Sequence, residues 1–572
     1  MRFIVLGEQF NVELFSFSYP NDGTRMSITF QRHPSNYNHW SLDIDGAIAT
    51  VTMGVDPQQP LNPGYELKLN SYDLGVDIEL ADLLMRLRFE HPGVRVVVLR
   101  ANDEKVWCAG ANILMLRSSA HHFKVNFCKF TNETRFAIED AQMHSNQHWI
   151  AAVRGVCAGG GYELAVCANE ILLADDGRSA VSLPEVPLLG VLPGTGGLTR
   201  VVDKRKVRRD HADVFSTLSD GVRGKRAKAW RLVDEAVPLS RFEDRIVECA
   251  QAAAGTATGA EAGIELTELQ FEHNDSGCDF EFVKLEIESS RRLATLTMRS
   301  PNQTAEAISE MTAQTIRKEG DKFWALKAYR ELNEALLHLR FNHIEVGTVL
   351  IKTEGDIDAS LAMDAKLAEL QDDDWFIREI VLYMGFVLRR LDLTARSFYA
   401  LIEEESCFAG SLLELGLAAD RSYLLEDEEG ENGIAIGALS SGSLPMSNGL
   451  TRIGSRYLHD PEKGQAIAQA QGRYYGIEAE EVGLVTFALD DIDYPDEVRP
   501  AIEERTSLSP DALTGMEANL RFAGSETVET KVFGRLSAWQ NWIFQRPNAV
   551  GEAGALQSFG EPTTPKFDWR RT

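Results

Sequence analysis

The sequence predicts an α/β fold that is built twice along one chain. Apolar, strand-like runs alternate with helical stripes over the first half, which is typical of an α/β architecture. A similar order of patterns returns about 250 positions later. The chain is also too long, at 572 residues, for a single hydrophobic core. We therefore expect two related domains.

The elements of the first half follow from hydrophobic periodicity. Ala47–Met53 and Glu170–Ala174 have strand patterns, and Val94–Leu99 is a continuous apolar run. A run of this kind is typical of a strand buried on both faces. Residues 78–90 carry leucines at helical spacing and predict a helix. Trp149–Val153 predicts a further buried strand.

The second half repeats short segments of the first in the same order. Two pairs lie 252 positions apart and one lies 251 apart: Leu87–His91 with Leu339–His343, Gly197–Arg200 with Gly449–Arg452, and Glu163–Ala168 with Glu414–Ala419. Several ordered matches at nearly one offset indicate a tandem duplication.

A glycine triplet, Gly159–Gly161, joins an apolar run to a helix-forming run that begins at Glu163. Glycine lets a ligand approach main-chain N–H groups closely. The start of a helix leaves such donors unpaired, so an oxyanion could be stabilised there with Glu163 nearby. The spacing does not fit phosphate-binding loops. A tight turn without a ligand stays open as an alternative.

Two further features accompany the triplet. Cys108–Asn112 forms a second glycine-containing turn between a strand and a helix, and Glu185 lies between two prolines. Without other information, Glu163 could be a helix N-terminal acid and Glu185 a loop acid. The second half has Gly410-Ser-Leu412 in place of the triplet and Gly437 in place of Glu185. It also lacks a recognisable partner for the second turn, so we expect a scaffold there.

These motifs in this order resemble the crotonase (enoyl-CoA hydratase/isomerase) superfamily, well over residues 45–255 and in decayed form over 286–490. Longer stretches are similar to one branch of it, the ring-cleaving lyases of aerobic benzoyl-CoA degradation. They are Leu67–Leu80, Lys124–Arg135 and Ser182–Arg200.

The resemblance implies an α/β fold of tandem duplicated crotonase-like cores, each a ββα superhelix. The second core is degenerate, and a helical C-terminal region follows. Residues 255–280 are rich in Gly, Thr, Ala and Glu, a composition that indicates a linker. The expected divisions are an N-terminal extension, a catalytic domain, this linker, a degenerate domain and a C-terminal helical region with its tail. Their ranges are 1–35, 36–255, 256–285, 286–490 and 491–572, respectively.

The resemblance also implies roles for single residues. The backbone N–H groups of Ala111 and Gly160 would form an oxyanion hole, and Glu163 and Glu185 would be the acid/base pair. Substrate contacts are expected around the two turns. A contact with coenzyme A is expected just before the first helix, where superfamily members bind it. These residues are Lys68, Ala109, Gly110, Asn112, Gly159 and Gly161.

Two polar segments have open interpretations. The helix after the second turn could line a pocket for the ring through His122, Lys124, Asn126, Lys129 or Glu133, or it could present a solvated face. Residues 204–209 are basic and could contact the coenzyme A phosphates, or form a surface patch balanced by acids.

The implied reaction opens a 2,3-dihydrodiol or 2,3-epoxide of benzoyl-CoA with water, giving a 3,4-didehydroadipyl-CoA semialdehyde and formate. No metal and no cofactor are expected, since coenzyme A is part of the substrate. Two alternatives are a simple enoyl-CoA hydratase, which would use the same glutamates, and a non-catalytic acyl-CoA-binding protein.

Composition excludes several classes of partner. A formal net charge of −28 argues against nucleic-acid binding, and no apolar run is long enough to span a membrane. The seven cysteines are scattered, which fits a reducing compartment, so we expect a cytoplasmic protein. Its partner is expected to be a small CoA thioester. We also expect a homo-oligomer, with a dimer compatible with the internal duplication.

Overall fold

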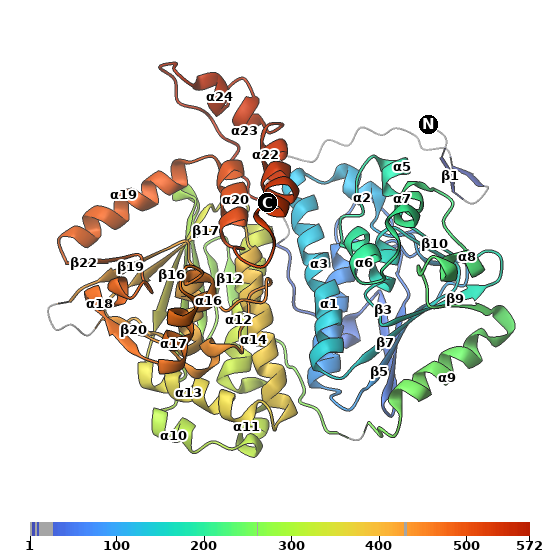
Figure 1. Cartoon of the computed structure of the whole chain (residues 1–572), viewed down its shortest axis with the longest axis horizontal. Coiled ribbons are helices and arrows are strands. Elements are labelled where there is room, and N and C mark those ends of the chain that lie inside the picture. Colours follow the sequence, from blue (N-terminus) through green and yellow to red (C-terminus); the bar gives the residue numbers. More distant parts are fainter. Residues whose placement is uncertain (1–2, 6–7, 11–26, 260, 428–431) are drawn as a thin grey trace.

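The computed structural model contains two α/β halves that lie side by side, with a helical C-terminal region on the second half (Figure 1). It describes residues 3–5, 8–10, 27–259, 261–427 and 432–572. Near the N-terminus, β1 (Phe3–Val5) and β2 (Glu8–Phe10) pair antiparallel. Within the described residues, no helix is long and apolar enough to cross a membrane.

The first half is built on a six-stranded sheet in the order β11-β9-β7-β5-β4-β3. All neighbours are parallel except β3 and β4, which form an antiparallel pair. The predicted buried strand is β5, an inner strand of the sheet. Val96–Leu99 in this strand is buried on both faces. The bounds are β3 (Trp40–Asp45), β4 (Ile48–Met53), β5 (Val96–Ala101), β7 (His148–Val153), β9 (Glu170–Asp175) and β11 (Glu235–Pro238).

A smaller parallel sheet, β10-β8-β6, stands beside the main one and carries both glycine-containing turns. Its strands are β6 (Val106–Cys108), β8 (Val156–Ala158) and β10 (Ala180–Ser182). The helices of this half are α1 (Leu74–Phe89), α2 (Ile113–Ser118), α3 (His121–His144), α4 (Gly160–Ala165), α5 (Glu185–Leu189), α6 (Gly197–Asp203), α7 (Arg209–Thr217), α8 (Gly224–Ala229) and α9 (Phe242–Ala254).

The main sheet of the second half repeats this strand order and adds two strands at one edge, giving β12-β13-β14-β15-β16-β17-β19-β22. Its first inner pair is again antiparallel and the following pairs are parallel. The strands are β12 (Glu272–Asn274), β13 (Gly277–Asp279), β14 (Val283–Glu288), β15 (Leu293–Arg299), β16 (Thr348–Glu354), β17 (Ser397–Ile402), β19 (Arg421–Leu425) and β22 (Phe487–Leu489). The shared order supports the predicted duplication.

The helices of the second half surround the same kind of sheet. They are α10 (Ala305–Ser309), α11 (Ala313–Glu319), α12 (Trp324–Asn342), α13 (Ile357–Leu370), α14 (Trp375–Leu393), α15 (Leu413–Ala418), α16 (Arg452–Arg456), α17 (Pro461–Ala470) and α18 (Gly476–Glu481). The C-terminal region adds α19 (Asp493–Ser507), α20 (Pro510–Leu520), α21 (Val528–Lys531), α22 (Ser537–Ile543), α23 (Pro547–Val550) and α24 (Ala555–Ser558).

The segment predicted as a linker, 256–285, is partly integrated into the second half. It supplies both added edge strands, β12 and β13, and the first residues of β14. Leu266 and Leu269 within it are buried. The compositional signal that predicted a linker, rich in glycine and small polar residues, therefore marks a hairpin as well as a connection.

The two small sheets differ between the halves. The second contains β18 (Phe408–Ala409), β20 (Gly433–Ala435) and β21 (Arg473–Tyr475), in the order β18-β20-β21. Among the described residues, no strand pairs with β18 on the side where β6 pairs with β8. Helix α13 contacts β18 instead. The second half has thus lost the strand that leads into the second glycine-containing turn.

A seam of buried charges joins the two halves, where α1 and α3 meet α12 and α14. Glu133 on α3 accepts hydrogen bonds from Arg340 at 2.9 and 3.0 Å and lies 3.2 Å from a guanidinium nitrogen of Arg390. Arg88 on α1 pairs with Glu379 at 2.6 Å and with Asp140 at 2.8 Å. Each half therefore supplies counter-charges for the other.

We predict that Glu133→Gln destabilises the chain by about 3 kcal/mol, because two guanidinium groups would stay buried without their carboxylate. Chemical denaturation measures the change. The control is Glu104→Gln, which removes an exposed partner of Arg154 and should cost less than about 1 kcal/mol. Equal effects of the two substitutions would contradict this account of the seam.

Candidate active site

Each glycine of the triplet is required by a different contact. Gly159 has a positive φ of 53°, and a Cβ there would lie 2.7 Å from Oε1 of Glu185. At Gly160, a Cβ would lie only 2.0 Å from the hydroxyl of Tyr72. A Cβ at Gly161 would lie 2.6 Å from the carbonyl oxygen of Cys108. Any other residue would push these neighbours apart.

The two glycine-containing turns meet at this point. Gly110 has a φ of 89°, and a Cβ on it would lie 2.8 Å from the backbone nitrogen of Gly160. Tyr72 fixes the second turn from the other side, because its N–H donates to Gly110 at 3.0 Å and its carbonyl accepts from Asn112 at 2.8 Å. The peptide of Ala111 is therefore held opposite the start of α4.

The N–H groups of Ala111 and Gly160 donate to no acceptor among the residues that the structure describes. Backbone donors that are buried in a protein almost always have a partner. Two unpaired donors beside each other provide a site for an oxygen atom that gains negative charge. The structure thus brings together the two N–H groups that the family resemblance implies.

Glu163 is buried and anchored by the loop that follows α5. Its Oε1 accepts hydrogen bonds from the N–H groups of Thr195 at 2.9 Å and Gly197 at 2.8 Å, and its Oε2 accepts from the Thr195 hydroxyl. Burial raises the pKa of Glu163, and these donors oppose the rise because they favour the ionised form. The carboxyl is therefore held in one orientation.

Glu185 has the opposite environment. It is the first residue of α5 and is 9% exposed. Its Oε2 has no hydrogen-bond partner among the described residues. Burial, followed by the negative charge of Glu163, raises the pKa of Glu185 to about 7. This carboxyl can take up or release a proton near neutral pH.

The corresponding place in the second half is filled by a side chain of the chain itself. Asp364 on α13 accepts a hydrogen bond at 3.0 Å from the N–H of Ser411, the counterpart of Gly160. A Cβ at Gly437, the counterpart of Glu185, would lie 2.3 Å from Oδ2 of Asp364. The carboxylate thus occupies the space that an acyl oxygen would need.

The counterpart of Glu163 is also neutralised there. Glu414 accepts from Ser440 at 2.7 Å and pairs with Arg452 at 3.2 Å. In the first half the equivalent arginine, Arg200, instead pairs with Glu139 at 2.9 Å and leaves Glu163 without an ion pair among the described residues. The second half therefore has neither a free donor at Ser411 nor an available carboxylate.

Two residues predicted to contact substrate, Asn112 and Lys68, interact with groups of the chain itself. The side chain of Asn112 caps α2 by accepting from Met115 at 2.9 Å, and its amide donates to Glu66 at 2.8 Å and Ser71 at 3.0 Å. With its carbonyl and amide both engaged, Asn112 braces the turn. Lys68 lies on the surface, with its side chain 73% exposed, in an ion pair of 2.8 Å with Glu66.

The polar face of α3, for which the sequence leaves a ring pocket and a solvated face open, contacts mainly the seam between the two halves. Asn126 donates to the carbonyl of Arg340 at 3.3 Å, and Lys129 donates to the carbonyl of Thr572 at 2.9 Å. Glu133 pairs across the seam as described above. His122 is buried near the start of the helix, and Lys124 is half-buried.

The basic segment 204–209 is balanced by local acceptors, as in the surface-patch interpretation. Lys204 pairs with Glu139 at 3.0 Å. Arg205 pairs with Asp234 at 2.8 Å. Arg208 forms an exposed pair with Asp210, an interaction worth little in water.

Sequence reasoning missed two residues near Glu163, which are Thr195 and Cys128. Thr195 lies within Pro193–Gly197, a segment predicted only as a motif, yet it provides two of the donors to Glu163. Burial raises the pKa of the Cys128 thiol on α3 to about 11, and the negative charge of Glu163 adds to this rise. Neither role has a local sequence signal, because both depend on how distant segments pack.

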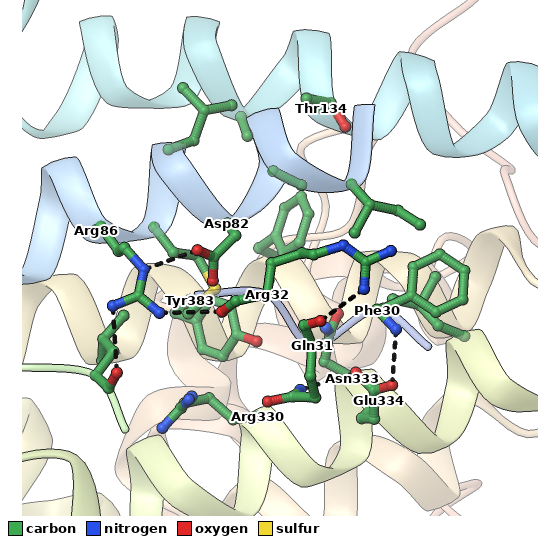
Figure 2. Close-up of a pocket in the computed structure, with 18 of the residues that line it drawn as sticks. Phe30, Gln31, Arg32, Asp82, Arg86, Thr134, Arg330, Asn333, Glu334 and Tyr383 are labelled. Atoms are coloured by element: carbon green, nitrogen blue, oxygen red, sulfur yellow. Dashed lines mark hydrogen bonds and ion pairs between the residues drawn. The ribbon is translucent and has the colours of Figure 1, made fainter. Parts of the chain in front are cut away.

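A separate cavity of about 100 Å³ lies in the seam and not at the glutamates. Figure 2 shows Phe30, Gln31 and Arg32 entering it between the helices of the two halves. Glu334 accepts from the N–H of Phe30 at 3.3 Å and from the amide of Gln31 at 3.0 Å. The polar groups shown there are largely satisfied by one another, so we assign this cavity to the packing of the halves.

In the part of the chain that the structure describes, no group of three or more His, Cys, Asp or Glu residues is arranged to hold a metal ion. The chemistry available at the site itself is that of two carboxyl groups and two free backbone donors. Such a set can stabilise an oxyanion and move protons.

Comparisons with known proteins agree with this geometry. The enoyl-CoA hydratase/isomerase family model matches residues 66–264. A benzoyl-CoA-dihydrodiol lyase from Aromatoleum evansii is 53% identical over 548 residues, which cover 95% of this chain and 98% of that protein. The fatty acid oxidation complex subunit alpha of Shewanella loihica is 31% identical over 37% of this chain and 28% of its own length.

Similarity to solved structures covers part of this chain. The enoyl-CoA hydratase from Geobacillus kaustophilus HTA426 is 30% identical, with a TM-score of 0.34, and the match covers 39% of this chain and 77% of that one.

We predict that Glu185→Gln stabilises the chain at pH 8 and not at pH 5. A carboxyl whose pKa rises on folding binds its proton more tightly in the folded state. Its stabilising effect is present below the ordinary value near 4.5 and is lost as pH rises to about 7. The glutamine avoids this loss, which amounts to at most about 3 kcal/mol.

Chemical denaturation at the two pH values measures the difference. As a control, Glu139→Gln should destabilise at pH 8, because its partners Arg200 and Lys204 lower the pKa of Glu139. A gain from Glu185→Gln that is the same at pH 5 and pH 8 would contradict the raised pKa.

Proposed function

The chain belongs to the family of benzoyl-CoA-dihydrodiol lyases, within the crotonase superfamily, and from this premise we propose that its first half performs the ring opening at Glu163 and Glu185. It is a lyase that acts on a CoA thioester. The observation that supports the proposed site best is the pair of free N–H donors, at Ala111 and Gly160, beside a carboxyl with a pKa of about 7.

The proposed substrate is a benzoyl-CoA whose ring has lost its aromaticity through oxygenation at carbons 2 and 3. One ring carbon leaves as formate, and the remaining six acyl carbons form a 3,4-didehydroadipyl-CoA semialdehyde. The atoms balance with one water for the dihydrodiol and two for the epoxide. The thioester carbonyl is conjugated with the ring and takes up electron density as the carbon–carbon bond breaks.

In this mechanism the N–H groups of Ala111 and Gly160 hold the thioester oxygen while it gains charge. One donor of this kind is typically worth about 3 kcal/mol in the transition state. Glu185 exchanges the proton with substrate or water, because its Oε2 has no partner among the described residues and its pKa is about 7. Glu163, held by Thr195 and Gly197, provides a fixed acceptor and keeps the pKa of Glu185 high.

We propose that the second half is a scaffold. Asp364 occupies the place of the acyl oxygen there, and Arg452 neutralises Glu414. Its contribution to the active half is mechanical, because its counter-charges satisfy Glu133 and Arg88 at the seam. The proposal adds no cofactor or metal, since coenzyme A enters as part of the substrate.

The exposed position of Lys68 near the second turn supports a contact with the coenzyme A moiety, which carries phosphates. We further propose a homo-oligomer, with a dimer as the simplest form. Val528, Phe533 and Phe544 in the C-terminal helical region are exposed, and exposed apolar side chains of this kind favour contact between subunits.

The reaction is tested by incubating the protein with epoxidised benzoyl-CoA, or with the dihydrodiol, and measuring formate. We expect formate release together with a semialdehyde thioester. Crotonyl-CoA serves as the second substrate, because an enoyl-CoA hydratase would use the same glutamates. Hydration of crotonyl-CoA without formate from either oxygenated thioester would refute the proposal.

We predict that Glu163→Gln and Glu185→Gln each lower turnover by at least about 100-fold while binding of benzoyl-CoA persists, since each removes a proton acceptor but little volume. The matched control is Glu414→Gln, the same change at the counterpart in the second half. It should leave the turnover of folded protein within about twofold. Loss of activity in the control alone would move the active site to the second half.

A further inference from the structure

Tyr72 places a buried hydroxyl beside the proposed oxyanion hole, and no residue that the structure describes satisfies it. The residue is 2% exposed, and its hydroxyl has no hydrogen-bond partner among the described residues. A buried polar group without a partner costs about 1–3 kcal/mol. In a native structure such a group calls for an explanation, and a missing ligand is one.

The position of this hydroxyl is closely defined. It lies against the Cα of Gly160, where a Cβ would be 2.0 Å away. The backbone of Tyr72 also forms hydrogen bonds with Gly110 and Asn112, the residues on either side of Ala111. The one residue therefore contacts the two peptide units that carry the free N–H donors.

The ring of Tyr72 is held rigidly. It packs against Phe127, with ring centroids 5.9 Å apart, and the guanidinium of Arg135 lies 5.5 Å from its centroid. Arg135 is fixed by a buried ion pair of 3.0 Å with Asp77. Thr131 donates to the same carboxylate at 2.5 Å. The hydroxyl cannot easily turn away to find another acceptor.

The second half gives an internal comparison. At the position 252 residues later stands Trp324, which is also buried. Its indole N–H donates to the carbonyl of Arg299 at 3.0 Å. The half in which the hole is filled has a satisfied donor at this position, whereas the half with an open hole has an unsatisfied one.

We propose that the Tyr72 hydroxyl is a third donor of the active site and donates a hydrogen bond to the thioester carbonyl oxygen held by Ala111 and Gly160. This inference rests on the proposed function, because it uses the same bound thioester. Tyr72 transfers no proton. Burial keeps its pKa well above the ordinary value, so the hydroxyl stays protonated and acts as a donor only.

The test is Tyr72→Phe, which removes the hydroxyl and keeps the ring. The first readout is the carbonyl stretch of benzoyl-CoA, labelled with ¹³C at the thioester carbon and bound to the protein. Hydrogen bonds lower this frequency. We expect the variant to lose part of the downward shift seen with the wild type. An unchanged frequency would overturn the proposal.

The second readout is kcat for the ring-opening reaction. Loss of one donor to a developing oxyanion lowers kcat by about 100-fold or more in known cases, so we expect at least a 10-fold fall with little change in KM. The free energy of unfolding should stay equal or rise, because an unsatisfied hydroxyl is removed. A clear loss of stability would show that the hydroxyl has a partner in the free chain, and would also overturn the proposal.

The matched control is Tyr329→Phe in the second half, which removes a buried hydroxyl that donates to Ser411 at 3.2 Å. It should lose stability and keep the wild-type carbonyl frequency and kcat. The readouts also separate this inference from the proposed function. If the wild type releases no formate, the proposed reaction fails, whereas the carbonyl frequency of bound benzoyl-CoA still tests the hydroxyl.

Discussion

The close approach of two backbone turns is the constraint on which the site depends. The start of α4 and the turn before α2 meet so closely that no Cβ fits at Gly110 or Gly161. This contact leaves the N–H groups of Ala111 and Gly160 side by side and without acceptors among the described residues. The unpaired donors have a cost in the free chain, and a bound oxygen atom can recover it.

Duplication shows what happens when this constraint is relaxed. Both halves keep the same strand order, because it is set by buried apolar strands that tolerate substitution. In the second half α13 takes the place of β6 and its turn, and Asp364 satisfies the donor at Ser411. Arg452, whose counterpart Arg200 pairs elsewhere, neutralises Glu414. The second half has kept the core and replaced the reactive arrangement with internal pairs.

Hydrophobic patterns predict the strands, and ordered matches at nearly one offset predict the duplication, whereas the pairing of Ala111 with Gly160 is implied only by the family resemblance. Contacts between distant segments were not accessible in this way. Asn126 and Glu133, for which a ligand contact is one of two interpretations that the sequence leaves open, satisfy groups of the other half. The composition of residues 256–285 predicts a linker, but the segment also contains the hairpin of β12 and β13. Glycine and polar residues are frequent in linkers and in hairpin turns alike. The different environments of the two glutamates also depend on Thr195, which no motif assigns.

We propose that only the first half holds a thioester oxygen. A crystal structure of the protein with bound benzoyl-CoA tests this most directly. We expect one thioester per chain, with its carbonyl oxygen within hydrogen-bonding distance of the backbone nitrogens of Ala111 and Gly160, about 2.7–3.1 Å. The side chain of Asp364 should still accept the hydrogen bond from the N–H of Ser411. A thioester bound at Ser411, or a carbonyl oxygen away from both donors of the first half, would contradict it.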